Sequence, residues 1–370
     1  MQKFYSISSR QHSATAVIAE CAQLLDAAPV AANFGFIYAT DEMSSDYEKL
    51  LHMCKEKTGI KHWVGSLGIG IIAGEEEIYE EPAASIMLAE FDADEFAILP
   101  LIRQSSEIAS KFKTPHAFAT SFMLIHGDPF HEETRNLIEG LYQNIDNAFI
   151  VGGLTSSRDK QFQIADEVFS GGVSGAVFSE KTGVLTNLSQ GCSPVGEKHR
   201  ITRAQENVVF TLDQKPALNV MMDDIGVASY DELKQTDADV FVGLCIPGAD
   251  VNDYTVRNLV GVDFDHDVFA INDYLDEGGE LVFCRRDQES AVEDMQRMLD
   301  NIAGRLQRSP RGGVYISCLG RGREQFGNNS EEVKMIHQKL GDFPLAGFFA
   351  NGEIHHDKLY GYTGVLALFV

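Results

Sequence analysis

The sequence predicts an α/β (α+β) protein with two domains, in which mixed sheets are flanked by helices. At 370 residues the chain is long enough for about two domains of roughly 150 residues each. Its hydrophobic content of 44% and charged fraction of 23% are typical of a folded chain. A pattern of strand, helix, strand, polar corner and strand then occurs three times, which indicates a duplicated structural unit.

The three copies are recognised by alternating strand-like and helix-like apolar periodicity. The first has strands at 33–40, 61–70 and 84–91, a helix at 45–58 and an acidic corner at 75–81. The second, residues 117–178, has strands at 121–126, 148–154 and 173–178, a helix at 132–144 and a corner at 155–162. The third has strands at 313–319 and 344–350, a helix at 330–340, the turn Asn351-Gly352 and a closing strand at 364–370. We interpret the copies as parts of two sheets covered by helices.

The charge and the termini narrow the classes of partner. Nucleic acids and anionic membranes are bound by clustered Lys and Arg. The formal net charge of -25 therefore argues against both as partners. The N-terminus lacks the apolar core of a signal peptide, and no apolar run approaches the roughly 18 residues of a membrane helix. The six cysteines are dispersed without a CxxC pair, which argues against a zinc site. We therefore expect a cytoplasmic protein that binds neither nucleic acid nor membrane.

No motif indicates catalysis, so a non-enzymatic protein is predicted. The glycines at 65, 68, 70 and 74 have the wrong spacing for a dinucleotide fingerprint, and an acidic cluster follows them. His126 and His131 flank a turn in HGDPFHEE, which is no zinc-protease motif, and we expect their side chains to cap or solvate the loop. One enzyme hypothesis stays open, in which Cys192 or Cys318 is a nucleophile whose base is distant in sequence.

Arginines at strand-to-loop junctions form the main candidate site of the second half. Arg257 precedes a strand, Arg285 follows the strand GELVFC, and Arg321 follows the strand GVYISCL. In so acidic a chain these arginines are candidates for an anion or carboxylate pocket. The alternative is that they form structural ion pairs that hold loops in place.

Several stretches, in this order, resemble the FIST family of sensory proteins. They are MLIHGD, IVGGLTSS, QGCSPVGE, VVFTLDQKPAL, TVRNLVGVD, EGGELVFCRRD, ISCLGRGREQFG and PLAGFFANGEI. The resemblance covers the chain from about residue 30 onward. The resemblance implies a domain boundary near Val208, within the Gly- and Pro-containing segment 188–218 that is typical of an inter-domain crossing. The expected domains are an N-terminal domain 1–207 and a C-terminal domain 208–370.

The resemblance implies a stand-alone signal-transduction sensor that binds a small ligand, such as an amino acid, and relays it to a partner protein. A histidine kinase or a cyclic-dinucleotide enzyme is the partner that the family suggests. We expect the ligand to be bound by Arg257, Arg285, Arg321, Asn351 and Glu353, with the arginines pairing an anionic group. The alternative is a haem-binding nitric-oxide sensor of the same family, for which His355 and His356 are the candidate haem ligands.

Overall fold

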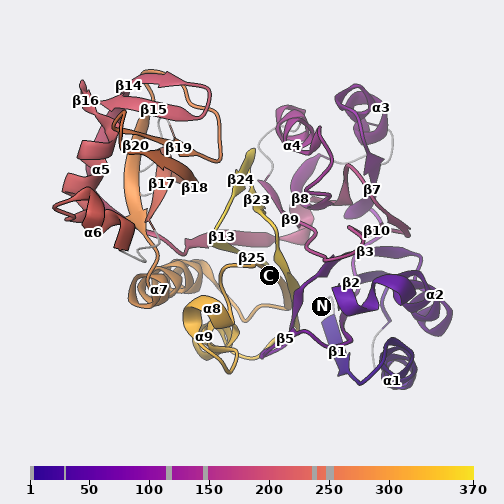
Figure 1. Ribbon diagram of the computed structural model, residues 1–370. Coiled ribbons are helices and arrows are strands. Elements are labelled where there is room, and N and C mark those ends of the chain that lie inside the picture. Colours follow the sequence, from indigo (N-terminus) through magenta and orange to yellow (C-terminus); the bar gives the residue numbers. More distant parts are fainter. Residues whose placement is uncertain (1–3, 29–30, 114–118, 145–148, 236–239, 247–253) are drawn as a thin grey trace. The chain divides into compact units, whose positions relative to one another are not determined.

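The computed structural model describes residues 4–28, 31–113, 119–144, 149–235, 240–246 and 254–370 (Figure 1). The chain forms two compact units, a larger one of Met1–Ser189 with Asp294–Val370 and a smaller one of Gln190–Glu293. This division by compactness differs from the domain boundary between residues 207 and 208 that the sequence suggests. Each unit combines helices with multi-stranded sheets, which confirms the predicted α/β class.

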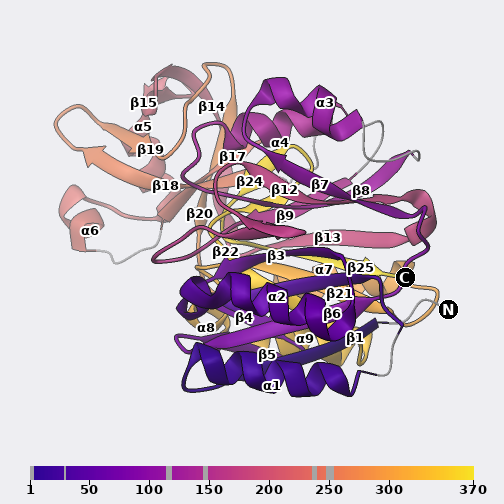
Figure 2. The same ribbon diagram turned by 90° about the vertical axis from the view of Figure 1, so that its right-hand side faces the viewer.

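The larger unit consists of three repeats, and the first of them lies at the N-terminus. Its elements are β1 (Phe4–Arg10), α1 (Ala14–Asp26), β2 (Phe34–Thr40), α2 (Tyr47–Thr58), β3 (His62–Gly68), β4 (Gly70–Ala73), β5 (Glu76–Tyr79) and β6 (Ala83–Ala89). Ser13 caps α1 by accepting a hydrogen bond from the Ala16 amide, and Gly59 ends α2 with a positive φ of 72°. Helices α1 and α2 cover the outer face of their sheet (Figure 2).

The second repeat follows the same order of elements. They are β7 (Phe96–Ile102), α3 (Ile108–Lys113), β8 (Thr120–Gly127), α4 (Thr134–Gln143), β9 (Phe149–Leu154), β10 (Gln163–Ala165), β11 (Glu167–Phe169) and β12 (Val173–Ser179). The predicted copy agrees with this order, although residues 117, 118 and 145–148 lie outside the described residues. Ile108 of α3 and Leu137, Ile138 and Leu141 of α4 pack on the outer face of this sheet.

The third repeat contains the smaller unit as an insertion. It begins with β13 (Val184–Gln190), and residues Gln190–Glu293 of the smaller unit come next in the chain. It resumes with α7 (Gln288–Arg305), β21 (Gly312–Cys318), α8 (Arg323–Phe326), α9 (Glu331–Leu340), β22 (Leu345–Ala350), β23 (Glu353–His355), β24 (Lys358–Tyr360) and β25 (Thr363–Phe369). The insertion explains why the three copies are unevenly spaced in the sequence.

The polar corner of each repeat is a hairpin, and this corner hairpin pairs with the sheet of another repeat. The three hairpins are β4–β5, β10–β11 and β23–β24. Strand β4 of the first repeat pairs with β22 of the third, β10 of the second with β3 of the first, and β23 of the third with β9 of the second. The strand orders are β1-β6-β2-β3-β10-β11, β24-β23-β9-β8-β12-β7 and β13-β25-β21-β22-β4-β5. The expectation of two shared sheets is therefore wrong for the larger unit, whose described residues form three.

A glycine occupies the same register position in the parallel pair of every repeat. The facing residues are Gly65 and Ile37, Gly152 and Ile125, and Gly347 and Tyr315. A Cβ atom at these glycines would lie 1.8, 2.0 and 1.7 Å from the carbonyl oxygen of the facing residue. The repeated close contact supports duplication of one unit and leaves no room for a side chain.

Replacing Gly152 with alanine is expected to lower the free energy of unfolding by about 3 kcal/mol, because the added methyl group would collide with backbone of β8. Gly304 in α7 has no neighbour within 4 Å of the position that a Cβ atom would occupy, so Gly304→Ala should instead stabilise the chain, by up to about 1 kcal/mol. Urea unfolding of the two variants measures both changes. Equal changes in the free energy of unfolding for the two variants would contradict the close backbone contact at Gly152.

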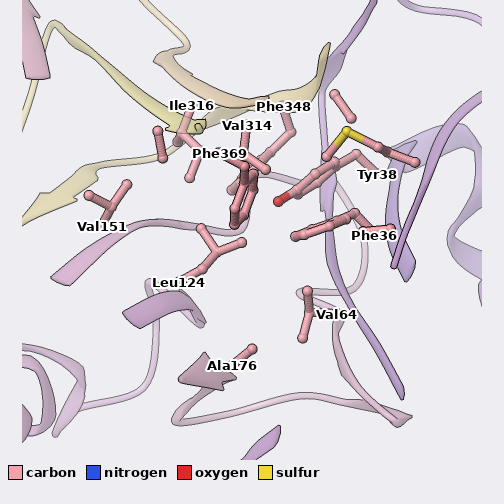
Figure 3. Close-up of a cluster of buried hydrophobic side chains, with 14 of the residues drawn as sticks. Phe36, Tyr38, Val64, Leu124, Val151, Ala176, Val314, Ile316, Phe348 and Phe369 are labelled. Carbon is pink, nitrogen blue, oxygen red and sulfur yellow. The ribbon is translucent and has the colours of Figure 1, made fainter. Parts of the chain in front are cut away.

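The core of the larger unit lies where the inner faces of the three sheets meet. Figure 3 shows side chains from all three repeats pointing toward one another, including Phe36, Leu124, Ile316 and Phe348. Phe369, in the last strand, packs on Phe36 and Phe122 with ring centroids 5.9 and 6.4 Å apart. The closing strand is thus central to this core.

The smaller unit has one sheet, with the strand order β14-β20-β17-β18-β19-β15-β16. Its elements are β14 (Ser193–Gln205), β15 (Val208–Leu212), β16 (Lys215–Pro216), α5 (Ala217–Ile225), α6 (Tyr230–Gln235), β17 (Val240–Cys245), β18 (Tyr254–Asp263), β19 (Val268–Ile271) and β20 (Glu280–Arg285). Leu218 and Met221 of α5 pack with Val209, Phe269 and Ile271 on one face of this sheet. Across the described residues of both units, no helix has the length and apolar character needed to cross a membrane.

Candidate functional site

The inner faces of the first and second sheets change from apolar to polar at the same level. Alternate residues of β2, β8 and β21 face the core, and the first of these are apolar in every repeat. The next inward position, near the carboxyl end of the strand, holds Tyr38 in β2 and His126 in β8. In the register of the glycine pairs the equivalent residue of β21 is the apolar Ile316, and Cys318 follows one inward position later. The first two repeats therefore place different polar side chains at equivalent positions.

Neighbouring strands extend this level with further polar residues. Ser85 lies opposite Tyr38, Ser174 lies opposite His126, and Glu353 lies opposite Gly153, which itself faces His126. We define the polar layer as the following residues: Tyr38, Ser66, Ser85, His126, Gln163, Ser174, Cys318, Glu353 and Thr363. All of them except the partly buried Cys318 are buried. A buried polar layer is unusual because each such group must find hydrogen-bond partners.

Part of the polar layer is held together by hydrogen bonds within and between repeats. The Tyr38 hydroxyl lies 3.2 Å from Nε2 of His126, and the Tyr38 ring stacks on Phe348 at 5.4 Å. Ser174 Oγ donates to Oε1 of Gln163 at 2.9 Å. These contacts fix the orientation of the Tyr38 and His126 rings.

Glu353 has one carboxyl oxygen satisfied and the other open. Its Oε2 accepts hydrogen bonds from the Thr363 amide at 3.1 Å and the Thr363 hydroxyl at 2.8 Å. Its Oε1 has no partner by hydrogen-bond geometry among the described residues. The nearby Cys318 thiol, a weak donor, helps to lower the pKa of this carboxyl, but burial dominates and raises the pKa to about 8. Glu353 is therefore largely protonated at pH 7.

Two more atoms of the polar layer lack partners within the described part of the chain. They are Oγ of Ser85 and Nδ1 of His126. Burial lowers the pKa of His126 to about 3, so its imidazole is neutral at pH 7. A buried polar atom without a partner costs about 1–3 kcal/mol, which a bound molecule can recover by hydrogen bonding to it. The layer thus presents neutral donors and acceptors.

The five residues expected to bind ligand are distributed over both units. Glu353 belongs to the polar layer, and Asn351 is exposed in the turn just before it. Arg257 and Arg285 belong to the smaller unit. Arg257 pairs with Asp273 at 2.6 Å, and the exposed Arg285 donates to the Ile225 carbonyl. Both arginines thus have protein partners, as the ion-pair alternative expects.

Arg321 is held in a fully buried ion pair on the outer side of its sheet. Its Nε donates to Glu332 Oε1 at 2.7 Å, and neither side chain has any exposed surface. Glu332 also accepts hydrogen bonds from Tyr315 at 2.6 Å, from Ser317 at 3.1 Å and from the Gly322 amide at 2.8 Å. This network joins β21 and the loop after it to α9. The charge of Arg321 is therefore neutralised within the protein.

The candidate haem ligands lie at the tip of the β23–β24 hairpin. The His355 and His356 rings contact each other edge-on at 4.5 Å, and His356 also packs against Phe149 at 4.7 Å. Burial, together with His356, lowers the pKa of His355. In the described parts of the chain, no three His, Cys, Asp or Glu side chains are grouped to hold a metal. The haem hypothesis stays a prediction that no contact here favours.

The cysteine hypothesis also stays a prediction, and the thiol environment does not favour it. Burial raises the pKa of the Cys318 thiol, and Cys192 is buried. A nucleophilic cysteine needs a depressed pKa, because the thiolate is the reactive form.

His126 is the polar-layer residue whose role the sequence did not reveal. The sequence placed it at the end of the strand 121–126 and gave it a role in capping or solvating the following loop, whereas it lies within β8 and has no exposed surface. The strand continues to Gly127, so the turn begins one residue later than the Gly-Asp-Pro signal suggests. Inward alternation from Phe122 and Leu124 is the signal that could have identified its position.

Comparisons with known proteins agree with the resemblance seen in the sequence. A model of the FIST N domain matches residues 33–215, and a model of the FIST C domain matches residues 217–356. An uncharacterised protein of Mycobacterium tuberculosis is 30% identical over 322 residues, which is 83% of each chain. An uncharacterised protein of Mycobacterium bovis is 30% identical over 321 residues, covering 83% of this chain and 82% of the relative.

Among solved structures, a cyanuric acid hydrolase from A. caulinodans is similar over 100% of this chain and 98% of its own, at 8% identity and a TM-score of 0.34. A score this low supports no argument about fold or function. The two domain matches and the mycobacterial relatives establish the family. The chain belongs to the FIST family, with a FIST N domain followed by a FIST C domain.

Proposed function

We propose that this chain is a signal-transduction sensor that binds a small, uncharged polar metabolite in the polar layer of the larger unit. FIST domains are sensory domains, and this role is the starting point of the proposal. The observation that carries it is the set of three buried atoms without hydrogen-bond partners among the described residues, namely Ser85 Oγ, His126 Nδ1 and Glu353 Oε1. Protein interiors rarely leave such atoms unpaired unless a ligand or ordered water binds them.

The chemistry of the polar layer selects an uncharged ligand. His126 is neutral and Glu353 is largely protonated at pH 7, so a ligand's charge would find no opposite charge on either residue. A molecule with amide or hydroxyl groups could instead accept from the Ser85 hydroxyl and the Glu353 carboxyl and exchange a hydrogen bond with His126. Of the residues expected from the sequence, we retain Glu353 as a direct contact.

The position of the layer offers a route from binding to signalling. The three repeats meet there, and each contributes at least one strand to it. A ligand that hydrogen bonds across repeats would stabilise one arrangement of them relative to others. A partner of the histidine-kinase or cyclic-dinucleotide class would read that change.

The test is native mass spectrometry of the full chain purified without denaturation, followed by a thermal-shift screen of neutral metabolites. Zwitterionic amino acids serve as the comparison class. We expect a retained or added neutral compound whose stabilising effect is lost in Glu353→Gln and Ser85→Ala. If only water fills the layer and no neutral compound stabilises the wild type, the proposal is wrong.

The unpaired hydroxyl gives a separate prediction about stability. Ser85→Ala should leave the ligand-free protein as stable as the wild type or more stable, because it removes a buried atom without a partner. Ser174→Ala, at the equivalent position of the second repeat, should cost about 1–3 kcal/mol because it leaves Oε1 of Gln163 without its donor. Chemical unfolding of both variants checks this. A large loss in Ser85→Ala would mean that its hydroxyl has an essential structural partner.

A further inference from the structure

We propose that the smaller unit carries a second, separate binding site, which takes a small amphipathic carboxylate. The site is a cavity of about 700 Å³ on the sheet of that unit. Its lining combines an apolar floor, which includes Val208, Phe210, Val268 and Ala270, with Arg203 and Asp263 at the rim. The volume lies within the range of small-molecule pockets, roughly 300–1,000 Å³.

The floor is formed by the sheet face that α5 leaves uncovered. Val209 and Phe269 are directly paired and point into the core beside α5. Their neighbours Val208 and Ala270 are also paired and, by strand alternation, lie on the opposite face. Phe210 and Val268 continue this face, and all four side chains are only partly buried. A ligand with an apolar body would remove this surface from water.

Arg203 supplies the positive charge for the anionic end of the ligand. Its guanidinium lies over the Phe210 ring at 4.8 Å. It makes no ion pair with any carboxylate in the described parts of the chain, although the protein carries a net charge of -25. A guanidinium stacked on an aromatic ring is oriented by that ring and keeps its edge N–H groups free to bind a carboxylate.

Asp263, the acidic residue at the rim, does not strongly repel an anionic ligand. Asp263 is paired with His266 at 2.9 Å and accepts hydrogen bonds from the amides of Asp265 and His266. These bonds compensate its charge and leave Arg203 as the unpaired charge of the rim. An apolar floor with one free cation is complementary to an amphipathic anion, and to neither a cation nor a fully polar molecule.

Titration of the full chain with three probes, followed by ligand-observed NMR, tests the site. Phenylacetate has the apolar ring and the charge, phenylacetamide has the ring alone, and acetate has the charge alone. We expect saturable binding of phenylacetate, about tenfold weaker binding of phenylacetamide, and undetectable binding of acetate, because a charge-assisted contact and apolar burial are both needed.

Variants locate the binding and separate it from the polar layer. Arg203→Gln should reduce the affinity for phenylacetate to that for phenylacetamide, and Ala270→Trp should block both by filling the floor. Arg200→Gln removes another exposed arginine of β14 that does not line the cavity, and it should change nothing. Ser85→Ala should also leave phenylacetate binding intact, so this site can fail or succeed independently of the proposed function. Equal binding of acid and amide, equal effects of the two arginine variants, or no saturable binding of phenylacetate would overturn the proposal.

Discussion

Arg321→Ala is expected to lower the free energy of unfolding by about 3–5 kcal/mol, because it leaves the buried Glu332 carboxylate without its counter-charge. Glu332 would keep its bonds from Tyr315, Ser317 and the Gly322 amide, but these neutral donors do not balance a buried charge. Urea unfolding at neutral pH measures the loss.

Arg323→Ala is the matched control, because Arg323 lies two residues later in the same segment. Its ion pair with Glu80 at 2.9 Å is substantially exposed, with 35% and 59% of the two side-chain surfaces accessible. Exposed pairs contribute about 0–1 kcal/mol, so this variant should be nearly as stable as the wild type. Similar, small losses in both variants would show that Arg321 is not a structural residue and would return it to the candidate ligand site.

Glu353→Gln is expected to change how stability depends on pH. The ordinary pKa of the carboxyl is 4.5, and burial raises it to about 8 in the folded chain. Below pH 4.5 the group is protonated in both states. Between pH 4.5 and about 8 only the folded state keeps the proton, so unfolding releases it and the stability falls as the pH rises.

The size of this effect follows from the shift in pKa. One pKa unit corresponds to about 1.4 kcal/mol, so Glu353 should cost the wild type roughly 4 kcal/mol by about pH 8 relative to acidic conditions. Glutamine does not titrate, and Glu353→Gln should therefore lose less stability than the wild type between about pH 5 and pH 9. Other titrating groups cancel in this comparison. Parallel stability curves for the two proteins would mean that Glu353 titrates normally and is accessible to water.

The repeat could be predicted from the sequence because the local periodicity of apolar residues specifies its strands and helices. Each copy has the same order of strand, helix, strand, corner and strand, and the structure has this order in all three. The exchange of corner hairpins could not be predicted, because β4 pairs with β22 across more than 250 residues and nothing local to either strand specifies the partner. The insertion of the smaller unit was hidden for the same reason.

The candidate site was predicted only in part. Glu353 stood out from its place in the corner, but its neighbours Thr363 and Cys318 come from other strands and are joined to it only by folding. Arg321 was expected to face a ligand because a basic residue after a strand resembles an anion site. Its partner Glu332, on α9, gives it a structural ion pair instead. Burial and pairing decide such roles, and neither is visible in sequence spacing.

A crystal structure of the full chain, purified without denaturation and solved in the presence of any neutral metabolite found by mass spectrometry, tests the central claim most directly. We predict electron density larger than a water molecule in the polar layer, within hydrogen-bond distance of Ser85 Oγ, His126 Nδ1 and Glu353 Oε1. A polar layer that contains only isolated waters, or whose three atoms bond to protein groups, would contradict the proposed sensor site.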